Sequence, residues 1–419
     1  MFEIVINGAE LYKALDYIEP AVENGMIYLE STDIGECILY SENKECAISI
    51  SLITASVPQK ATTDYIDYKV FKKLISTLKD EGNLTIHQDD NANEVLIHYR
   101  RGVKPVQLKT MSLPLLTKNP LAIMSASSDS ARFSTTSLCA ALKVCTEVID
   151  GQGASSVLDC CDFKVSKDHG TMYAINTNKA TGCTKKVPTS MDCNQEEFVM
   201  NLKPLKKVYS LFSSFKEMVI FQDANGICIC SGEEKVTNGK TGEDKLENVT
   251  EVRVVLHKFS SNYPTNIFYG VKHSDKTCML SLNAFNNSLD KVMALTDNQD
   301  KDVILEADDM NLTMSVTSKH GIIEDKIPLK MGSNVPFKGK FNVDTLKTIA
   351  NLCKPFKSSP FTPELYISPS NKSDSIFVMG SEVTGDNSGF ITSKVMNANT
   401  QDDDVEDIED EEEVQEESA

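Results

Sequence analysis

The chain has 419 residues, of which 41% are hydrophobic, so it is long and apolar enough for two or three globular domains. No run of 18 apolar residues occurs, and the N-terminal "MFEIVINGAEL" is acidic, so we expect neither a membrane span nor a signal peptide. The formal net charge is −19, but the last nineteen residues hold twelve acidic groups and no basic one. We therefore expect a disordered acidic tail over residues 398–419.

A short strand running directly into an amphipathic helix is predicted at six places along the chain. In chain order these segments are residues 2–22, 64–78, 131–149, 197–212, 278–296 and 339–353. Strand-like stretches follow each of them, such as "NLTIHQ" and "EVLIHYR" after the second. The pattern strand–helix–strands–strand–helix–strands thus occurs in three copies, at intervals of roughly 130 residues.

The three copies predict three α+β domains in which helices punctuate mostly antiparallel strands. We expect the first domain over residues 1–125, the second over 126–275 and the third over 276–397. The Ser/Ala-rich "MSASSDSA" marks the first boundary, and "EEKVTNGKTGEDKLEN", about residues 232–250, is polar and Gly-bearing and predicts an inserted surface loop.

Lysines repeat on the second helix of the first two copies. Residues 69–76 and 203–210 both read K-x-x-K-K-x-x-S. On a helix these lysines fall opposite an apolar stripe, which in the first copy contains Val70, Phe71, Leu74, Ile75 and Leu78. The third copy is poorer in lysine, with Asp344, Lys347, Thr348 and Asn351 in the matching places.

Repeated lysine faces in a net acidic chain favour contact with phosphates. The alternative is that each face is simply solvated. Single-strand binders interleave basic residues with stacking aromatics, but here Phe71, Tyr209 and Phe212 lie on or beside the apolar stripe and the chain has no Trp. The sequence therefore predicts loose contact with duplex DNA, without sequence preference.

No enzymatic or cofactor motif stands out. The twelve cysteines form no C-x-x-C pair, so we expect reduced thiols in a cytoplasmic protein and no metal. Phosphate-binding loop, G-x-S-x-G and H-E-x-x-H motifs are lacking. The carboxylates near His87 and Glu306 read as turn residues, and we expect no cofactor and no catalysis.

Several stretches resemble the bacterial-type DNA polymerase sliding clamp, the β clamp. Residues 131–149 look like the start of that family's middle domain, "SSNYPTNIF" resembles its aromatic-Pro-Asp/Asn turn, and "GKFNVDTLKTIANL" is similar to the start of its last helix. The resemblance implies three copies of the clamp fold, with helices lining a ring and antiparallel sheets outside. It implies a processivity factor in which two chains close head to tail around duplex DNA and tether a polymerase.

The resemblance also implies residue roles. DNA contacts would come from Lys72, Lys73, Arg100, Arg101, Lys143, Lys206, Lys207 and Lys347. A homodimer interface would join Val106 and Leu108 of one chain to Ala294 and Leu295 of the other, and Ala294 is smaller than the family's usual residue. A pocket for short peptides of the polymerase and the clamp loader would involve Thr177, Asn178, Pro264, Phe268, Tyr269, Val395 and Met396.

The chain departs from the family pattern around that pocket. The family reads Thr-Asp-Gly-His-Arg-Leu where this chain has "TNKATG", and its Met-Pro-Met-Arg-Leu end is replaced by "SKVMN". Together with the acidic tail, this divergence favours a viral clamp acting in a host cytoplasm. The tail itself would shield the basic surface or recruit a basic partner, or serve only solubility.

Three other interpretations stay open from the sequence. One is a viral single-stranded-DNA-binding protein with an acidic C-terminal tail. Another is a clamp built from two-domain chains in threes, against which the third copy argues. The last is a multidomain structural protein with no nucleic-acid role. The sequence does not identify the polymerase, the loader or the host.

Overall fold

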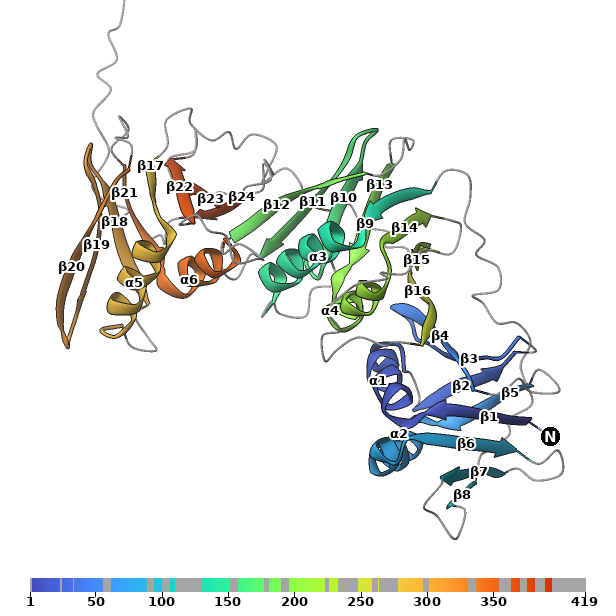
Figure 1. Ribbon diagram of the computed structural model, residues 1–419. Helices are drawn as coiled ribbons and strands as arrows, with labels where there is room; N and C mark the ends of the chain where they lie inside the picture. Colours follow the sequence, from blue (N-terminus) through green and yellow to red (C-terminus); the bar gives the residue numbers. More distant parts are fainter. Residues whose placement is uncertain are drawn as a thin grey trace, which may run out of the picture. The chain divides into compact units, whose positions relative to one another are not determined.

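A computed structural model describes most of the chain (Figure 1). The described residues are 2–22, 25–32, 34–55, 62–88, 94–99, 106–109, 130–150, 157–176, 181–189, 196–222, 226–232, 248–257, 263, 278–296, 301–330, 337–353, 363–369, 375–380 and 389–393. The chain divides into two compact units, Met1–Lys272 with Met379–Ile391, and His273–Val378 with Thr392–Ala419. The first unit contains the elements of the first two sequence copies; the expected three-domain division stays a prediction.

The first copy follows the predicted order of elements. They are β1 (Phe2–Asn7), α1 (Gly8–Ile18), the 3-10 turn η1 (Glu19–Ala21), β2 (Met26–Ser31), β3 (Glu36–Glu42), β4 (Cys46–Ile53), β5 (Thr62–Asp67), α2 (Tyr68–Leu78), η2 (Lys79–Glu81), β6 (Asn83–Gln88), β7 (Glu94–Tyr99) and β8 (Val106–Lys109).

The second copy repeats this order in the same unit. Its elements are β9 (Ala131–Ser134), α3 (Thr135–Ile149), β10 (Cys160–Val165), β11 (His169–Asn176), β12 (Thr181–Pro188), β13 (Glu196–Asn201), α4 (Leu202–Val208), η4 (Tyr209–Ser214), β14 (Glu217–Gln222), β15 (Gly226–Ser231) and β16 (Val249–His257). Leu138, Ala141, Leu142 and Cys145 of α3 lie at helical spacing on one face, and all four are buried.

The third copy contributes β17 (Cys278–Ser281), α5 (Leu282–Met293), β18 (Asp302–Ala307), β19 (Asn311–Ser318), β20 (Gly321–Pro328), β21 (Phe337–Asn342), α6 (Val343–Leu352), β22 (Glu364–Pro369), β23 (Ser375–Gly380) and β24 (Gly389–Ser393). Its strands pair antiparallel in the order β20-β19-β18-β21, and β17 pairs with β22. The prediction of an α+β fold with antiparallel sheets is confirmed.

One sheet joins the first two copies into a single body. Its eight strands run β5-β2-β3-β4-β16-β15-β14-β9, and β4 of the first copy pairs antiparallel with β16 of the second, with Ile48 opposite Val254. Two further groups of strands from the first two copies run β1-β6-β7-β8 and β13-β10-β11-β12. The β4–β16 ladder therefore fixes α1 and α2 relative to α3 and α4.

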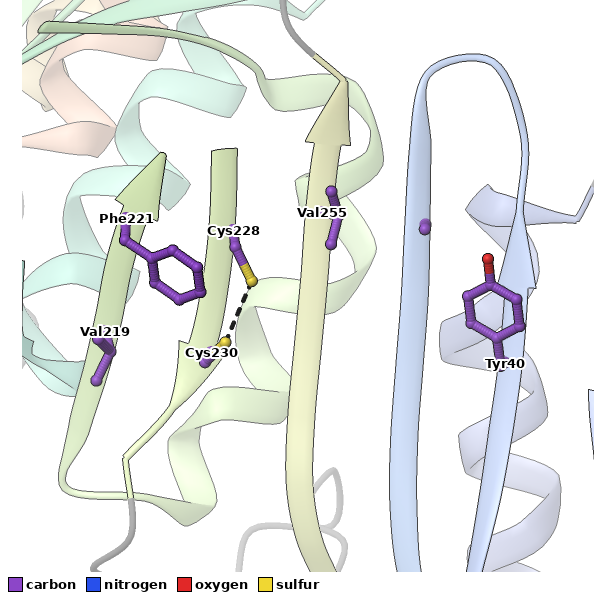
Figure 2. Close-up of a cluster of buried hydrophobic side chains, with 7 residues drawn as sticks. Tyr40, Val219, Phe221, Cys228, Cys230 and Val255 are labelled. Carbon is purple, nitrogen blue, oxygen red and sulfur yellow. Dashed lines mark hydrogen bonds between the residues drawn. The ribbon is translucent and has the colours of Figure 1, made fainter. Parts of the chain in front are cut away.

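A buried apolar cluster crosses this β4–β16 seam (Figure 2). The first copy supplies Tyr40 and Ala47, and the second supplies Val219, Phe221, Cys228, Cys230 and Val255. Ser41, the strand neighbour of Tyr40, points to the other face of the sheet and donates a hydrogen bond to the carbonyl of Ala21 in η1. The cluster thus lies on the face away from η1 and holds the two copies together by apolar burial.

No helix of the described residues is long and apolar enough to cross a membrane.

Candidate nucleic-acid interface

Each described α-helix begins where a strand ends, and in all of them except α3 the side chain of the last strand residue caps the helix. Asn7 accepts hydrogen bonds from two backbone N–H groups of α1, and Asp67, Asn201, Ser281 and Asn342 each accept one at α2, α4, α5 and α6. Short polar side chains at these positions stop the strand and satisfy the first N–H groups of the helix. The two helices of each copy lie side by side, α1 with α2, α3 with α4 and α5 with α6 (Figure 1).

The lysines of α2 are not equivalent. Lys72 is half-buried: its Nζ donates to Asp16 Oδ1 of α1 at 2.8 Å and to the Tyr68 hydroxyl at 2.8 Å. Partial burial acts to lower the pKa of Lys72, but the bonds to Asp16 and Tyr68 outweigh it and raise the pKa above its usual value. Lys73 is exposed, and no ion pair joins it to another described residue.

The predicted apolar stripe of α2 needs one correction. Val70 is 51% exposed, whereas Tyr68, Phe71, Ile75 and Leu78 are buried. The helix begins at Tyr68, whose side chain takes the core position two turns before Ile75, and Val70 is thereby turned to solvent. The prediction that Val70 belongs to the stripe is wrong.

In the second copy both central lysines carry ion pairs. Lys206 Nζ lies 2.8 Å from Asp150 Oδ1, at the end of α3. Lys207 Nζ lies 2.5 Å from Glu19 Oε2, in the first copy. This hydrogen bond from Lys207 is the main reason why the pKa of Glu19 is lowered, with Lys72 adding to the effect against partial burial. Lys207 therefore ties the helices of the two copies across the seam.

The third copy repeats the arrangement of the first two. Lys347 Nζ of α6 lies 2.6 Å from Asp290 Oδ1 of α5. Lys143 of α3 pairs more loosely with Glu147, at 3.9 Å and one turn further along the same helix. Of the predicted DNA-contacting lysines in the described part of the chain, only Lys73 has no carboxylate partner there.

These acidic partners were missed by reasoning that looked only at lysines. The signal was in the spacing: Asp16, Asp150 and Asp290 precede Lys72, Lys206 and Lys347 by 56, 56 and 57 residues. The paired helices therefore present alternating charges rather than a continuous basic stripe. Such a surface can hold phosphates only weakly.

The predicted dimer-interface residues are partly described. Ala294, just after α5, is exposed, and Leu295 is half-buried. Val106 and Leu108 lie on β8, opposite Ile97 and Val95 of β7. Arg100, Arg101 and the predicted peptide-pocket residues, Thr177, Asn178, Pro264, Phe268, Tyr269, Val395 and Met396, lie outside the described residues, as do the acidic tail and most of the expected loop at 232–250.

Neither the cysteines nor the carboxylates form a metal centre within the described ranges. The cysteines described are free thiols, and all of them except Cys139 are buried. Burial raises the pKa of the Cys37 thiol to about 12, which keeps it protonated and unreactive. Asp308, in the turn after Glu306, accepts hydrogen bonds from the backbone N–H groups of Met310 and Asn311, which is the role of a turn residue.

Comparison with solved structures finds bacterial clamps. The β subunit of DNA polymerase from Streptococcus pyogenes superposes with a TM-score of 0.75 at 12% identity, over 94% of this chain and 100% of that one. The DNA polymerase sliding clamp of Pseudomonas aeruginosa with ligand gives 0.74 at 11%, over 95% and 100%. The Helicobacter pylori β clamp bound to a DNA ligase peptide gives 0.71 at 14%, again over 95% and 100%.

Comparison by sequence, in contrast, finds no match among protein-family models or curated proteins. At 11–14% identity the agreement lies in the backbone and in the order of elements. Because it extends over about 95% of this chain and the whole of the others, it covers all three sequence copies. The chain therefore has the fold of the bacterial DNA polymerase sliding clamps.

Proposed function

We propose that this protein is a DNA sliding clamp, a processivity factor that encircles duplex DNA and tethers a DNA polymerase. The observation that carries the proposal is the likeness to bacterial clamps over about 95% of the chain, including a threefold repeat of paired helices. The lysines of these helices are mostly paired with carboxylates and would bind phosphate only weakly. DNA would therefore be retained by enclosure in the ring and not by strong binding to the helices.

Two chains would close head to tail into the ring. In this arrangement β8, with Val106 and Leu108, meets the end of α5 at Ala294 and Leu295 of the other chain. Exposure of Ala294 is consistent with an interface there. The edge strand of each sheet would then be paired with its neighbour, which removes an open edge.

Within the ring, Lys72, Lys73, Lys143, Lys206, Lys207 and Lys347 would face the duplex, together with Arg100 and Arg101. They would contact phosphates and read no base sequence. Weak, sequence-independent contact lets a ring move along DNA while its topology prevents its loss.

The polymerase and a clamp loader would bind through short peptides at the pocket that includes Thr177, Pro264 and Met396. The peptide-bound H. pylori clamp supports this type of partner. We further propose that the protein catalyses no reaction, needs no cofactor, and acts in the cytoplasm, for a viral polymerase.

Negative-stain electron microscopy of the purified protein tests the architecture. We expect two-chain rings with a central hole wide enough for a DNA duplex. Compact particles without a hole, at concentrations where a dimer persists, would contradict the proposal and favour the single-stranded-DNA-binding alternative.

A further inference from the structure

The same ion pair links the two helices of each copy. An aspartate near the end of the first helix meets a lysine of the second: Asp16 with Lys72 at 2.8 Å, Asp150 with Lys206 at 2.8 Å, and Asp290 with Lys347 at 2.6 Å. The near-constant spacing of 56 or 57 residues shows that the pairs occupy matching places in the repeat.

The carboxylate is the more exposed partner in each pair. Side-chain exposure is 50% for Asp16 against 20% for Lys72, and 63% for Asp290 against 21% for Lys347. In the second copy the two values are closer, 62% for Asp150 and 54% for Lys206. A phosphate that approaches one of these lysines from solvent therefore meets a carboxylate beside it.

A lysine ammonium has three donors and can be shared between a carboxylate and a phosphate. Sharing brings two negative groups close together, and their repulsion offsets part of the attraction to the lysine. Binding a phosphate also leaves the carboxylate to take up a cation from solution, which cancels part of the counterion release that normally drives protein–DNA association.

We propose that Asp16, Asp150 and Asp290 are built-in competitors of DNA phosphate, which keep the lysine contacts of the clamp weak. This inference rests on the proposed function, because it places duplex DNA against these helix pairs. A strong grip on phosphate would slow movement along the duplex, and the ring supplies retention without it. The aspartates thus keep the affinity for phosphate low, while the closed ring retains the DNA.

The test compares two triple variants that remove equal charge. One is Asp16→Asn, Asp150→Asn and Asp290→Asn. The control is Glu197→Gln, Glu306→Gln and Glu324→Gln, whose carboxylates pair with Lys164, Lys338 and Lys326 on strands at 3.2, 2.8 and 3.4 Å. Thermal midpoints of the two variants check that both fold. Binding of each to a fluorescein-labelled linear duplex is followed by anisotropy.

We expect the aspartate variant to bind the duplex about 30-fold more tightly than wild type at about 50 mM salt, and the control to change by less than about threefold. The slope of log affinity against log salt should steepen by up to about 0.9 for each aspartate removed. Equal affinities and slopes for the two variants would overturn the inference, while duplex binding by the wild type would leave the proposed function standing.

A double-mutant cycle in the second copy distinguishes the effect of the Asp150–Lys206 ion pair from the effect of the overall charge. Lys206→Gln should weaken duplex binding by less than about twofold in the wild type, where Asp150 offsets that lysine, and by about fivefold or more in the Asp150→Asn background. Equal losses in the two backgrounds would contradict the inference. If neither the wild type nor any variant binds the duplex at the lowest salt, the inference is overturned, because removing the carboxylates has not strengthened the contact; the proposed function does not depend on this affinity and is tested by imaging the ring.

Discussion

Asp162 in β10 gives a pH-dependent prediction about stability. Its side chain is fully buried, and neither carboxylate oxygen accepts a hydrogen bond from the described residues. Burial, reinforced by the nearby charge of Glu197, raises its pKa to about 6, although Lys164, with Nζ 3.7 Å away, opposes the shift. In the unfolded chain the carboxyl would titrate near 3.8.

The direction in which stability changes with pH depends on how many protons the folded and the unfolded states bind. Between about pH 4 and pH 6 the folded protein holds a proton on Asp162 that the unfolded chain has lost, so stability falls as pH rises through this window. The two pKa values differ by about 2, which corresponds to a loss of up to about 3 kcal/mol by pH 7. Below about pH 4 both states are protonated and the loss is absent.

Asp162→Asn removes this titration. The unfolding free energy of the variant minus that of wild type, measured by urea unfolding from about pH 4 to pH 8, should rise by up to about 3 kcal/mol. The packing cost of the amide does not depend on pH and cancels from the trend.

Asp325→Asn serves as a control of opposite sign. Hydrogen bonds from Lys291 and Ser288 lower the pKa of Asp325, so its ionised form stabilises the fold above its unfolded pKa, and that gain is lost as the pH falls. The difference for this variant should therefore fall with rising pH only below about pH 4, in a urea series extended to about pH 2, and stay flat from about pH 4 to pH 8. A flat difference curve for Asp162→Asn would refute the account of a buried, poorly partnered carboxylate.

Three further predictions concern the apolar cluster at the β4–β16 seam, the DNA contact of Lys73 and the cap of α4. Phe221→Ala should cost about 3–4 kcal/mol of unfolding free energy in urea, and Val70→Ala, at an exposed site, less than about 0.5; equal effects would contradict the seam cluster. Lys73→Gln should weaken duplex binding in the anisotropy assay and reduce the salt slope by about 1, whereas Lys326→Gln on a strand should leave both unchanged. Asn201→Ala should lower stability by about 1 kcal/mol through loss of the α4 cap, and an unchanged urea midpoint would argue against it.

The repeat and its helices could be predicted because local rules determine them. The segment from Asp67 to Leu78 combines a capping side chain with apolar residues at helical spacing, and both signals lie within a few residues. Strand–helix junctions with a capping side chain and apolar residues at helical spacing occur in all three copies. The repeat can therefore be recognised in the sequence although no family model and no curated protein matches the chain.

Pairing between helices could not be predicted from such local signals. The half-buried state of Lys72 depends on Asp16, which lies 56 residues away and is brought near only by the packing of α1 on α2. The exposure of Val70 depends on where α2 starts, and helix starts are the least certain feature of a periodic pattern. The seam between β4 and β16 likewise joins residues separated by about 200 positions.

Topological linkage to duplex DNA is the central claim, and it can be tested without a loader. The protein is allowed to thread onto a linear duplex with biotin at both ends, streptavidin then blocks the ends, and the complex is washed at high salt. We predict that the protein stays on the blocked duplex, leaves when the duplex is cut internally, and leaves an unblocked duplex during the wash. Equal loss from blocked and unblocked duplexes would show that the protein does not encircle DNA.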